Sequence, residues 1–157
     1  MSELTQIKDF LQISDSISTA GQPTSQEFLA IKHSGHQTVI NLALLDSPGA
    51  ITDESKIVQD LGLDYVHIPV QWDSPKPQDA LRFFEVMNQH EDETLFIHCA
   101  ANKRVSAFVF LYRVLCLGDD RAIARNALHQ IWEPNPVWQN FINAMLQEFY
   151  PRKAPTF

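Results

Sequence analysis

The chain has 157 residues, of which 45% are hydrophobic and 20% are charged, a balance typical of a globular protein with its own core. The formal net charge of −7 argues against nucleic acid as a partner, because contacts to phosphates normally need a basic face. It also disfavours an anionic membrane surface, and no apolar run approaches the length of a membrane span. We therefore expect one domain over residues 1–157, with a loose tail at about 151–157.

The N-terminal residues and the cysteines favour a cytoplasmic location. The chain does not start with a basic segment followed by an apolar one, so no signal peptide is expected. Cys99 and Cys116 do not make a disulfide framework, and a reducing compartment would keep a reactive thiol usable. Cys116 lies on an apolar helix face, where a structural role is expected. His33, His36 and His67 are scattered, so we expect no metal site and no cofactor.

The first half of the chain alternates strand and helix patterns. Apolar residues within 11–17 hint at one or two short strands before Gly21. Thr24 and Glu27 have the spacing of a capping box, so a helix should begin there and end before Gly35. The elements expected next are a strand over residues 38–43, a helix over 51–61 and a strand over 65–70.

The second half begins with a stiff, proline-rich loop at residues 71–77. A buried strand is expected at residues 95–97, followed by a polar turn at 98–104. The helices expected in this half cover residues 78–89, 105–117, from an Asp119 cap to about Trp132, and 137–150. Alternating strands and helices predict an α/β layer sandwich with parallel strand pairing. Loops that follow the strands, at residues 44–46, 72–73 and 98–104, should then share one edge of the sheet.

Cys99 and Arg104 lie in the turn between the last predicted strand and an apolar helix. Such a turn gathers backbone N–H groups around one point and adds the positive end of the helix dipole, which stabilises a thiolate and an oxyanion. Arg104 supplies a planar, permanently charged fork that matches two oxygens of a phosphate. The turn therefore predicts a nucleophilic site for a phosphate- or sulfate-type anion. The other expected members of this anion-binding loop are His98, Ala100, Ala101, Asn102, Lys103, Val105 and Ser106.

Several neighbouring residues have an expected role. Asp73 is the first candidate for a general acid, because a carboxyl partly desolvated by Trp72 would keep its proton longer, although a plain turn role is the alternative. Asp46 is the second candidate. His98 is expected to hydrogen-bond the loop rather than to transfer protons. The loop has no glycine, so Asn102 is expected to adopt the positive φ that such a turn needs.

The segment from His98 to Arg104 resembles the signature of cysteine-dependent protein tyrosine and dual-specificity phosphatases. An ordered set of four segments is similar to a bacterial family of candidate phosphatases known as DUF442, namely residues 20–23, 38–42, 68–75 and 98–107. The resemblance implies a three-layer phosphatase-like sandwich, with a mainly parallel sheet of four to five strands flanked by helices.

The same resemblance implies a phosphoric monoester hydrolase that acts through a phosphocysteine, without a metal. Its substrate would be a phosphomonoester, with phosphotyrosine as one candidate, in a phosphorylated small molecule or a phosphoprotein. Cys99 would be the nucleophile, Arg104 the phosphate clamp and Asp73 the general acid, which are the roles that the residues themselves indicate.

The loop departs from that signature in two ways. The usual signature has five residues between Cys and Arg and a Ser or Thr directly after the Arg, whereas here four residues intervene and Val105 follows. The hydroxyl of Ser106 comes one position later and is not expected to point at the sulfur. Rhodanese-type sulfurtransferases carry a loop of this shorter length. A sulfurtransferase that passes a persulfide from Cys99, and a non-catalytic phosphate-binding module, are therefore alternatives.

Overall fold

The computed structural model describes residues 4–149, so the expected tail at about 151–157 lies outside it. Its centre is a five-stranded sheet in the order β1-β2-β5-β3-β4. The first two strands pair antiparallel, and every other neighbouring pair is parallel. The strands are β1 (Leu11–Ser14), β2 (Ile17–Ala20), β3 (Thr38–Asn41), β4 (Asp64–His67) and β5 (Leu95–His98). The predicted α/β sandwich with a mainly parallel sheet is confirmed.

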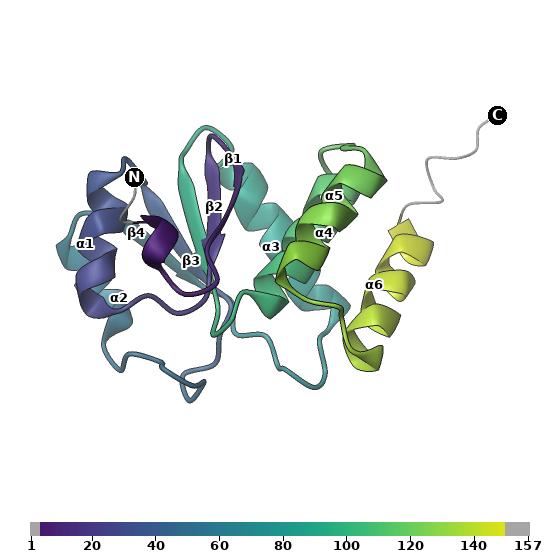
Figure 1. Cartoon of the computed structure of the whole chain (residues 1–157), viewed down its shortest axis with the longest axis horizontal. Coiled ribbons are helices and arrows are strands. Elements are labelled where there is room, and N and C mark those ends of the chain that lie inside the picture. The colour runs from purple at the N-terminus through teal and green to yellow at the C-terminus, as the bar shows by residue number, and fades with distance from the viewer. Residues whose placement is uncertain (1–3, 150–157) are drawn as a thin grey trace.

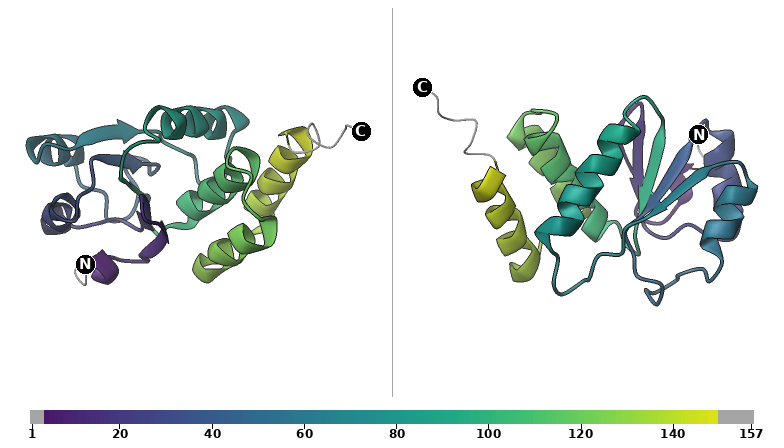
Figure 2. Two further views of the ribbon diagram at one scale, coloured as in Figure 1. Left: turned by 90° about the horizontal axis from the view of Figure 1, so that it is seen from above. Right: turned by 180° about the vertical axis from the view of Figure 1, so that it is seen from behind.

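Helices cover both faces of the sheet, as Figures 1 and 2 show. One layer contains the short 3-10 helix η1 (Leu4–Gln6), α1 (Ser25–His33) and α2 (Glu54–Asp60). The other contains α3 (Pro77–Gln89) and α4 (Lys103–Leu115), and α5 (Arg121–Ile131) and α6 (Pro136–Phe149) pack on α4. Because side chains alternate along a strand, β3 and β5 contribute to two separate cores. Val39 and Phe96 pack with α1 and α2, whereas Ile40 and Ile97 pack with α3 and α4.

Most predicted elements are present, but several boundaries differ. The capping box is confirmed, with Glu27 N–H donating to Thr24 Oγ1 at 3.2 Å and Thr24 N–H donating to the Glu27 carboxylate at 2.9 Å. β3 ends at Asn41 and β4 ends at His67, both earlier than predicted, because the chain leaves the sheet there to form loops. The last helix ends at Phe149 among the described residues, and Tyr150 lies outside them.

Five helix starts differ from the prediction, and the last helix begins one residue early, at Pro136. The second helix begins at Glu54, since the residues before it form a turn in which Glu54 N–H donates to Ile51 O. The third begins at Pro77, because proline fits the first helical position. The fourth begins at Lys103, which puts Arg104 in the helix rather than in the turn.

The fifth helix is capped by Asp120, not by Asp119. The Asp120 carboxylate accepts hydrogen bonds from the N–H groups of Ala122 and Ile123, whereas Asp119 forms an ion pair with Arg113 at 2.9 Å. Cys116 does not lie on an apolar helix face as expected, because it caps the C-terminal end of α4 and is exposed there.

The register of the sheet brings the functional loops together. Asn41, the last residue of β3, lies opposite His67 at the end of β4 and His98 at the end of β5. His98 in turn lies opposite Ala20 at the end of β2. Four parallel strands therefore end at one edge, from which the loops after β3 and β4 extend at the bottom of Figure 1. No helix within residues 4–149 is long and apolar enough to cross a membrane.

Candidate active site

A cavity of about 360 Å³ lies at this edge of the sheet. Three loops that are far apart in sequence line it, as expected from parallel strand order. The lining residues are Leu44, Asp46, Ser47 and Pro48 after β3, Trp72 after β4, and Cys99, Ala100, Ala101, Lys103 and Arg104 after β5. Both predicted acids are exposed, and of the two only Asp46 is among the residues that line the cavity. Four other predicted members of the site are buried and do not line the cavity, namely His98, Asn102, Val105 and Ser106.

Residues 99–102 connect β5 directly to α4, and together with Lys103 and Arg104 at the start of α4 they form the Cys99 loop. The first N–H groups of α4 have no acceptor within the helix, so they are available to an anion together with the positive end of the helix dipole. Two carbonyl groups of the loop are held by donors from elsewhere. The Cys99 carbonyl is 3.2 Å from His98 Nδ1, and the Ala100 carbonyl accepts from Gln22 N–H at 3.1 Å. The loop is therefore organised to present donors rather than acceptors to the cavity.

Asn102 has the positive φ that was predicted for it, at 64°. Its fully buried side chain donates to the Asp9 carbonyl at 2.9 Å and to Thr19 Oγ1 at 3.1 Å. These bonds tie the turn to the segment around β1 and β2. They hold a backbone conformation that is costly for most side chains but is tolerated by asparagine.

Gly21 allows the backbone after β2 to touch the Cys99 loop. Its N–H donates to the Lys8 carbonyl at 2.7 Å, and it forms an isolated bridge with Ala101. A Cβ at this position would lie only 2.7 Å from the Ala100 carbonyl oxygen, so a side chain cannot be added unless one backbone moves. This contact explains why a glycine precedes Gln22 and Pro23.

We expect Gly21→Ala to displace the Cys99 loop and to destabilise the fold by about 1–3 kcal/mol, the usual cost of forcing atoms into a packed site. The variant should also lose most of the thermal stabilisation that phosphate or sulfate gives the wild-type protein. Thermal unfolding with and without the anion measures both effects.

The control for this prediction is Gly118→Ala. Gly118 has φ of 71° and open space around it, away from the cavity, so the substitution should cost about 1 kcal/mol through backbone strain alone. It should leave the response to the anion intact. An undiminished anion response in Gly21→Ala would contradict the proposed role of this backbone contact.

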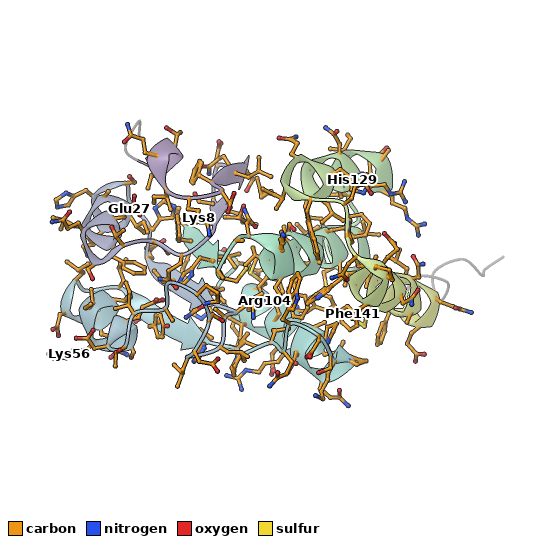
Figure 3. The ribbon with its side chains drawn as sticks, turned by 60° about the horizontal axis from the view of Figure 1, so that its bottom comes forward. Lys8, Glu27, Lys56, Arg104, His129 and Phe141 are labelled. Carbon is orange, nitrogen blue, oxygen red and sulfur yellow. The ribbon has the colours of Figure 1, made fainter. Side chains whose placement is uncertain are left out.

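The guanidinium of Arg104 is held from three sides. Its Nη1 donates to the Val70 carbonyl at 2.9 Å, its Nη2 lies 3.5 Å from Ser47 Oγ, and its Cζ lies 6.0 Å from the ring centre of Trp72. The side chain is 5% exposed, yet it lines the cavity, near the middle of the molecule in Figure 3. Such a fixed fork can bind two oxygens of an anion with little loss of side-chain entropy.

Aromatic rings form the wall around Lys103. Its ammonium lies 6.0 Å from the ring centre of Trp72 and 5.5 Å from that of Trp132, within the range of a cation–π contact. The Trp72 carbonyl accepts a 2.7 Å hydrogen bond from Trp138 Nε1, and Trp72 also packs against both other tryptophans. The loop before Asp73 is thus anchored to α6.

Ser106 points away from the cavity. Its hydroxyl donates to the Lys103 carbonyl at 2.9 Å and accepts from Trp132 Nε1 at 3.1 Å. Val105 is fully buried in the core. The hydroxyl that does line the cavity belongs to Ser47, which accepts a 3.0 Å hydrogen bond from Leu44 N–H.

The structure also reveals a buried carboxylate beneath the loop that the sequence patterns did not single out. Glu54, at the start of α2, lies 2.6 Å from His98 Nε2 and accepts hydrogen bonds from Gln22 Nε2 at 2.9 Å and from Tyr65 Oη at 3.0 Å. Acidic residues are common in the first turn of a helix, so the sequence around Glu54 does not mark it as part of a site. Only the tertiary structure shows its contact with His98 at the end of β5.

Burial alone would raise the pKa of Glu54, but the hydrogen bond and charge of His98 and the bonds from Gln22 and Tyr65 outweigh it and hold this pKa below its usual range. Ionised Glu54 therefore stabilises the fold at pH values above its ordinary pKa. That contribution is lost as the pH falls through the lowered pKa.

Within residues 4–149, no group of three or more His, Cys, Asp or Glu side chains is placed to hold a metal ion. The chemistry that the cavity offers is that of a buried thiol, a fixed guanidinium, a second cation and a carboxylate. These groups suit a nucleophilic attack on an anionic centre.

Comparisons with known proteins identify the family and the fold. The model of the PTP-NADK family, described as DSP-PTPase phosphatase fused to NAD+ kinase, matches residues 7–134. A DUF442 protein of Shewanella putrefaciens CN-32, a candidate phosphatase, is 34% identical in sequence. Its crystal structure superposes with a TM-score of 0.84 over 94% of this chain and 97% of that chain. No curated protein matches the chain.

More distant structures share the fold. PTPMT1, solved in complex with PI(5)P, has 13% identity and a TM-score of 0.77 over 94% of this chain and 100% of that chain. The catalytic domain of the PP-IP phosphatase SIW14 from S. cerevisiae has 14% identity and a TM-score of 0.72 over 87% and 85% of the two chains.

Proposed function

The chain belongs to the PTP-NADK family of DSP-PTPase phosphatases, and we propose that it hydrolyses phosphomonoesters through a phosphocysteine on Cys99. The observation that carries the proposal is the cavity in which the Cys99 thiol and the Arg104 guanidinium meet at the start of α4. A thiolate, a fixed cation and free N–H groups in one water-accessible site are what phosphoryl transfer to sulfur requires.

The proposed reaction has two steps. The Cys99 thiolate attacks phosphorus in line with the leaving oxygen, so an S–P bond forms while the P–O bond breaks, and the leaving oxygen takes a proton from a carboxylic acid. Water then attacks phosphorus, its proton passes to that carboxylate, and the S–P electron pair returns to sulfur. Arg104 and the loop N–H groups bind the three non-bridging oxygens in both steps.

Vanadate-sensitive hydrolysis of an aryl phosphate tests the proposal directly. After rapid acid quenching, mass spectrometry should find a phosphoryl group on the peptide that contains Cys99. Hydrolysis without any phosphorylated Cys99 peptide, even with a fast-leaving aryl substrate, would count against the covalent step.

The acid is proposed to be Asp46, with Asp73 as the alternative. Asp46 is among the residues that line the cavity, and Asp73 is not. The residue before Asp73, Trp72, is held by the hydrogen bond from Trp138 Nε1 to its carbonyl. Both carboxylates follow strands that end at the same edge, so the sequence pattern alone does not separate them.

We expect Asp46→Asn to slow hydrolysis of phenyl phosphate by about 10²-fold, because this poor leaving group needs a proton. Hydrolysis of p-nitrophenyl phosphate should fall much less, since its leaving group departs as an anion. Asp73→Asn is the matched control and should change neither rate strongly. If the leaving-group-dependent loss falls on Asp73→Asn instead, the acid is Asp73.

The proposed substrate is a phosphorylated small molecule or a phosphoprotein with an aromatic or apolar group next to the phosphate. Leu44, Pro48 and Trp72 give the cavity apolar lining. A phosphotyrosine-like group would place its ring against this lining. Phenyl phosphate should therefore be hydrolysed with a lower KM than glycerol phosphate.

A sulfurtransferase is the second candidate, and the loop length favours it. Only four residues separate Cys99 from Arg104, and this shorter ring suits a persulfide sulfur. Sulfur transfer to cyanide would need Cys99 but no acid. Thiosulfate turnover that survives in both Asp46→Asn and Asp73→Asn would therefore support this candidate over the phosphatase.

A further inference from the structure

Glu54 and His98 form a buried pair that takes no part in the proposed reaction. His98 is fully buried and Glu54 is 4% exposed, and neither lines the cavity around Cys99. A buried ionised group is costly unless it is paired, so each of these two residues depends on the other for its burial. The pair lies directly beneath the backbone of the Cys99 loop.

The hydrogen-bond partners of the two ring nitrogens indicate how many protons His98 carries. Nδ1 of His98 faces the Cys99 carbonyl oxygen at 3.2 Å, and Nε2 faces the Glu54 carboxylate at 2.6 Å. A carbonyl oxygen can only accept, so Nδ1 must carry a hydrogen. The Glu54 carboxylate already accepts from Gln22 and Tyr65, which favours its ionised form, so Nε2 donates as well. A ring that donates through both nitrogens carries a positive charge.

We propose that Glu54 is a positioning residue that keeps His98 doubly protonated, so that a fixed positive charge lies beneath the Cys99 loop and the Cys99 carbonyl is held away from the cavity. This inference rests on the proposed phosphatase function for its catalytic consequence. The charge attracts the thiolate and the bound phosphoryl group, and the bond to the carbonyl leaves the loop N–H groups to face the anion.

The groups around Glu54 support this arrangement. From β4, Tyr65 donates its hydroxyl hydrogen, and burial beside Glu54 raises the pKa of Tyr65, so that the phenol stays neutral. From the segment before α1, Gln22 supplies a neutral amide. Phe28 of α1 packs edge-on against the His98 ring at 6.0 Å. His67 lines the same small cavity as Glu54, but its Nε2 faces the Ala43 carbonyl at 2.6 Å.

The charged residues near Glu54 on α2 do not compensate its carboxylate, because they are paired elsewhere or are themselves negative. Lys56 forms an exposed ion pair with Asp60 at 2.9 Å. Asp53, the residue before Glu54, makes no side-chain cap to the helix. His98 is therefore the cation that compensates the Glu54 carboxylate in the part of the chain that the structure describes.

Glu54→Gln separates charge from packing. The amide has the shape of the carboxylate and can donate to Nε2 of a neutral His98, so the ring keeps its place and its Nδ1 hydrogen. We expect kcat/KM for an aryl phosphate to fall by about tenfold, the effect of removing one charge interaction over several ångströms in a protein interior. The acidic limb of the pH profile of kcat/KM should move to higher pH.

The chain offers a matched control in a second histidine–glutamate contact. His90 Nδ1 lies 2.9 Å from Glu93 Oε1, and both residues are at the far end of the sheet, away from Cys99. Glu93→Gln makes the same chemical change there, and it should leave both the rate and the pH profile unchanged. An equal loss of kcat/KM in both variants would show a general stability effect and would overturn the inference.

Nitrogen-15 NMR of the imidazole ring tests the inference in the wild-type protein, without depending on the stability of any variant or on activity. His98 should show two protonated ring nitrogens at neutral pH, and one in Glu54→Gln. A single protonated nitrogen in the wild-type ring would overturn the inference. If the NMR result holds while no phosphomonoester is hydrolysed by the wild-type protein, the proposed function fails and the pairing of Glu54 with His98 stands.

Discussion

Cys99→Ser is expected to reduce hydrolysis of an aryl phosphate by at least about 10³-fold, because a serine hydroxyl is a far weaker nucleophile than a thiolate at neutral pH. The substitution replaces one atom in a residue that is almost fully buried at the base of the cavity. The loop N–H groups and Arg104 should keep their positions. Phosphate or sulfate should therefore still raise the melting temperature of the variant.

Cys116→Ser is the matched control for this prediction. Cys116 is the second cysteine of the chain, and it lies exposed at the end of α4. Its replacement should leave kcat/KM unchanged. Full phosphatase activity in Cys99→Ser would refute the proposed nucleophile. Loss of both activity and the anion response would instead show that the sulfur is needed to hold the loop.

Arg104→Lys is expected to lower kcat/KM by about 10²- to 10³-fold, although the positive charge remains. The guanidinium bonds the Val70 carbonyl through one nitrogen, lies near Ser47 Oγ through another and faces the Trp72 ring. A lysine ammonium is a single point donor and cannot meet the Val70 carbonyl and present a fork to two oxygens at the same time. Phosphate affinity, measured by calorimetry, should fall together with the rate.

Arg113→Lys provides the control on the same helix. Arg113 is also partly buried and pairs with Asp119 at 2.9 Å, but it lies at the other end of α4. This change should cost a little stability and leave kcat/KM intact. If Arg104→Lys retains wild-type activity, the planar fork is not needed and the proposed clamp is wrong.

The features that could be predicted from the sequence are short-range ones. The capping box of α1 joins residues three positions apart, and the positive φ of Asn102 follows from a tight turn without glycine. The spacing of Cys99 and Arg104 places them in one turn between a strand and a helix. The order of strands and helices predicts a parallel sheet, and parallel strands bring their following loops to one edge.

Other features depend on how the loops turn after they leave the sheet. Asp46 and Asp73 both follow strands with neighbouring ends, yet only Asp46 is among the residues that line the cavity. Ser47 beside Arg104 and Gly21 against Ala100 are likewise contacts between separate segments, and neither residue has a local pattern that marks it.

The sequence predicts the turn that holds Cys99 and Arg104 and the sheet edge that carries this turn, because both depend on neighbouring residues and on strand order. Only the tertiary structure decided which groups surround that turn. Glu54 lies 44 positions from His98, and no periodicity or spacing relates the two residues. Their contact exists because α2 packs on α1 and β4, which brings its first residue to the end of β5, and such packing depends on the shape and burial of many side chains at once.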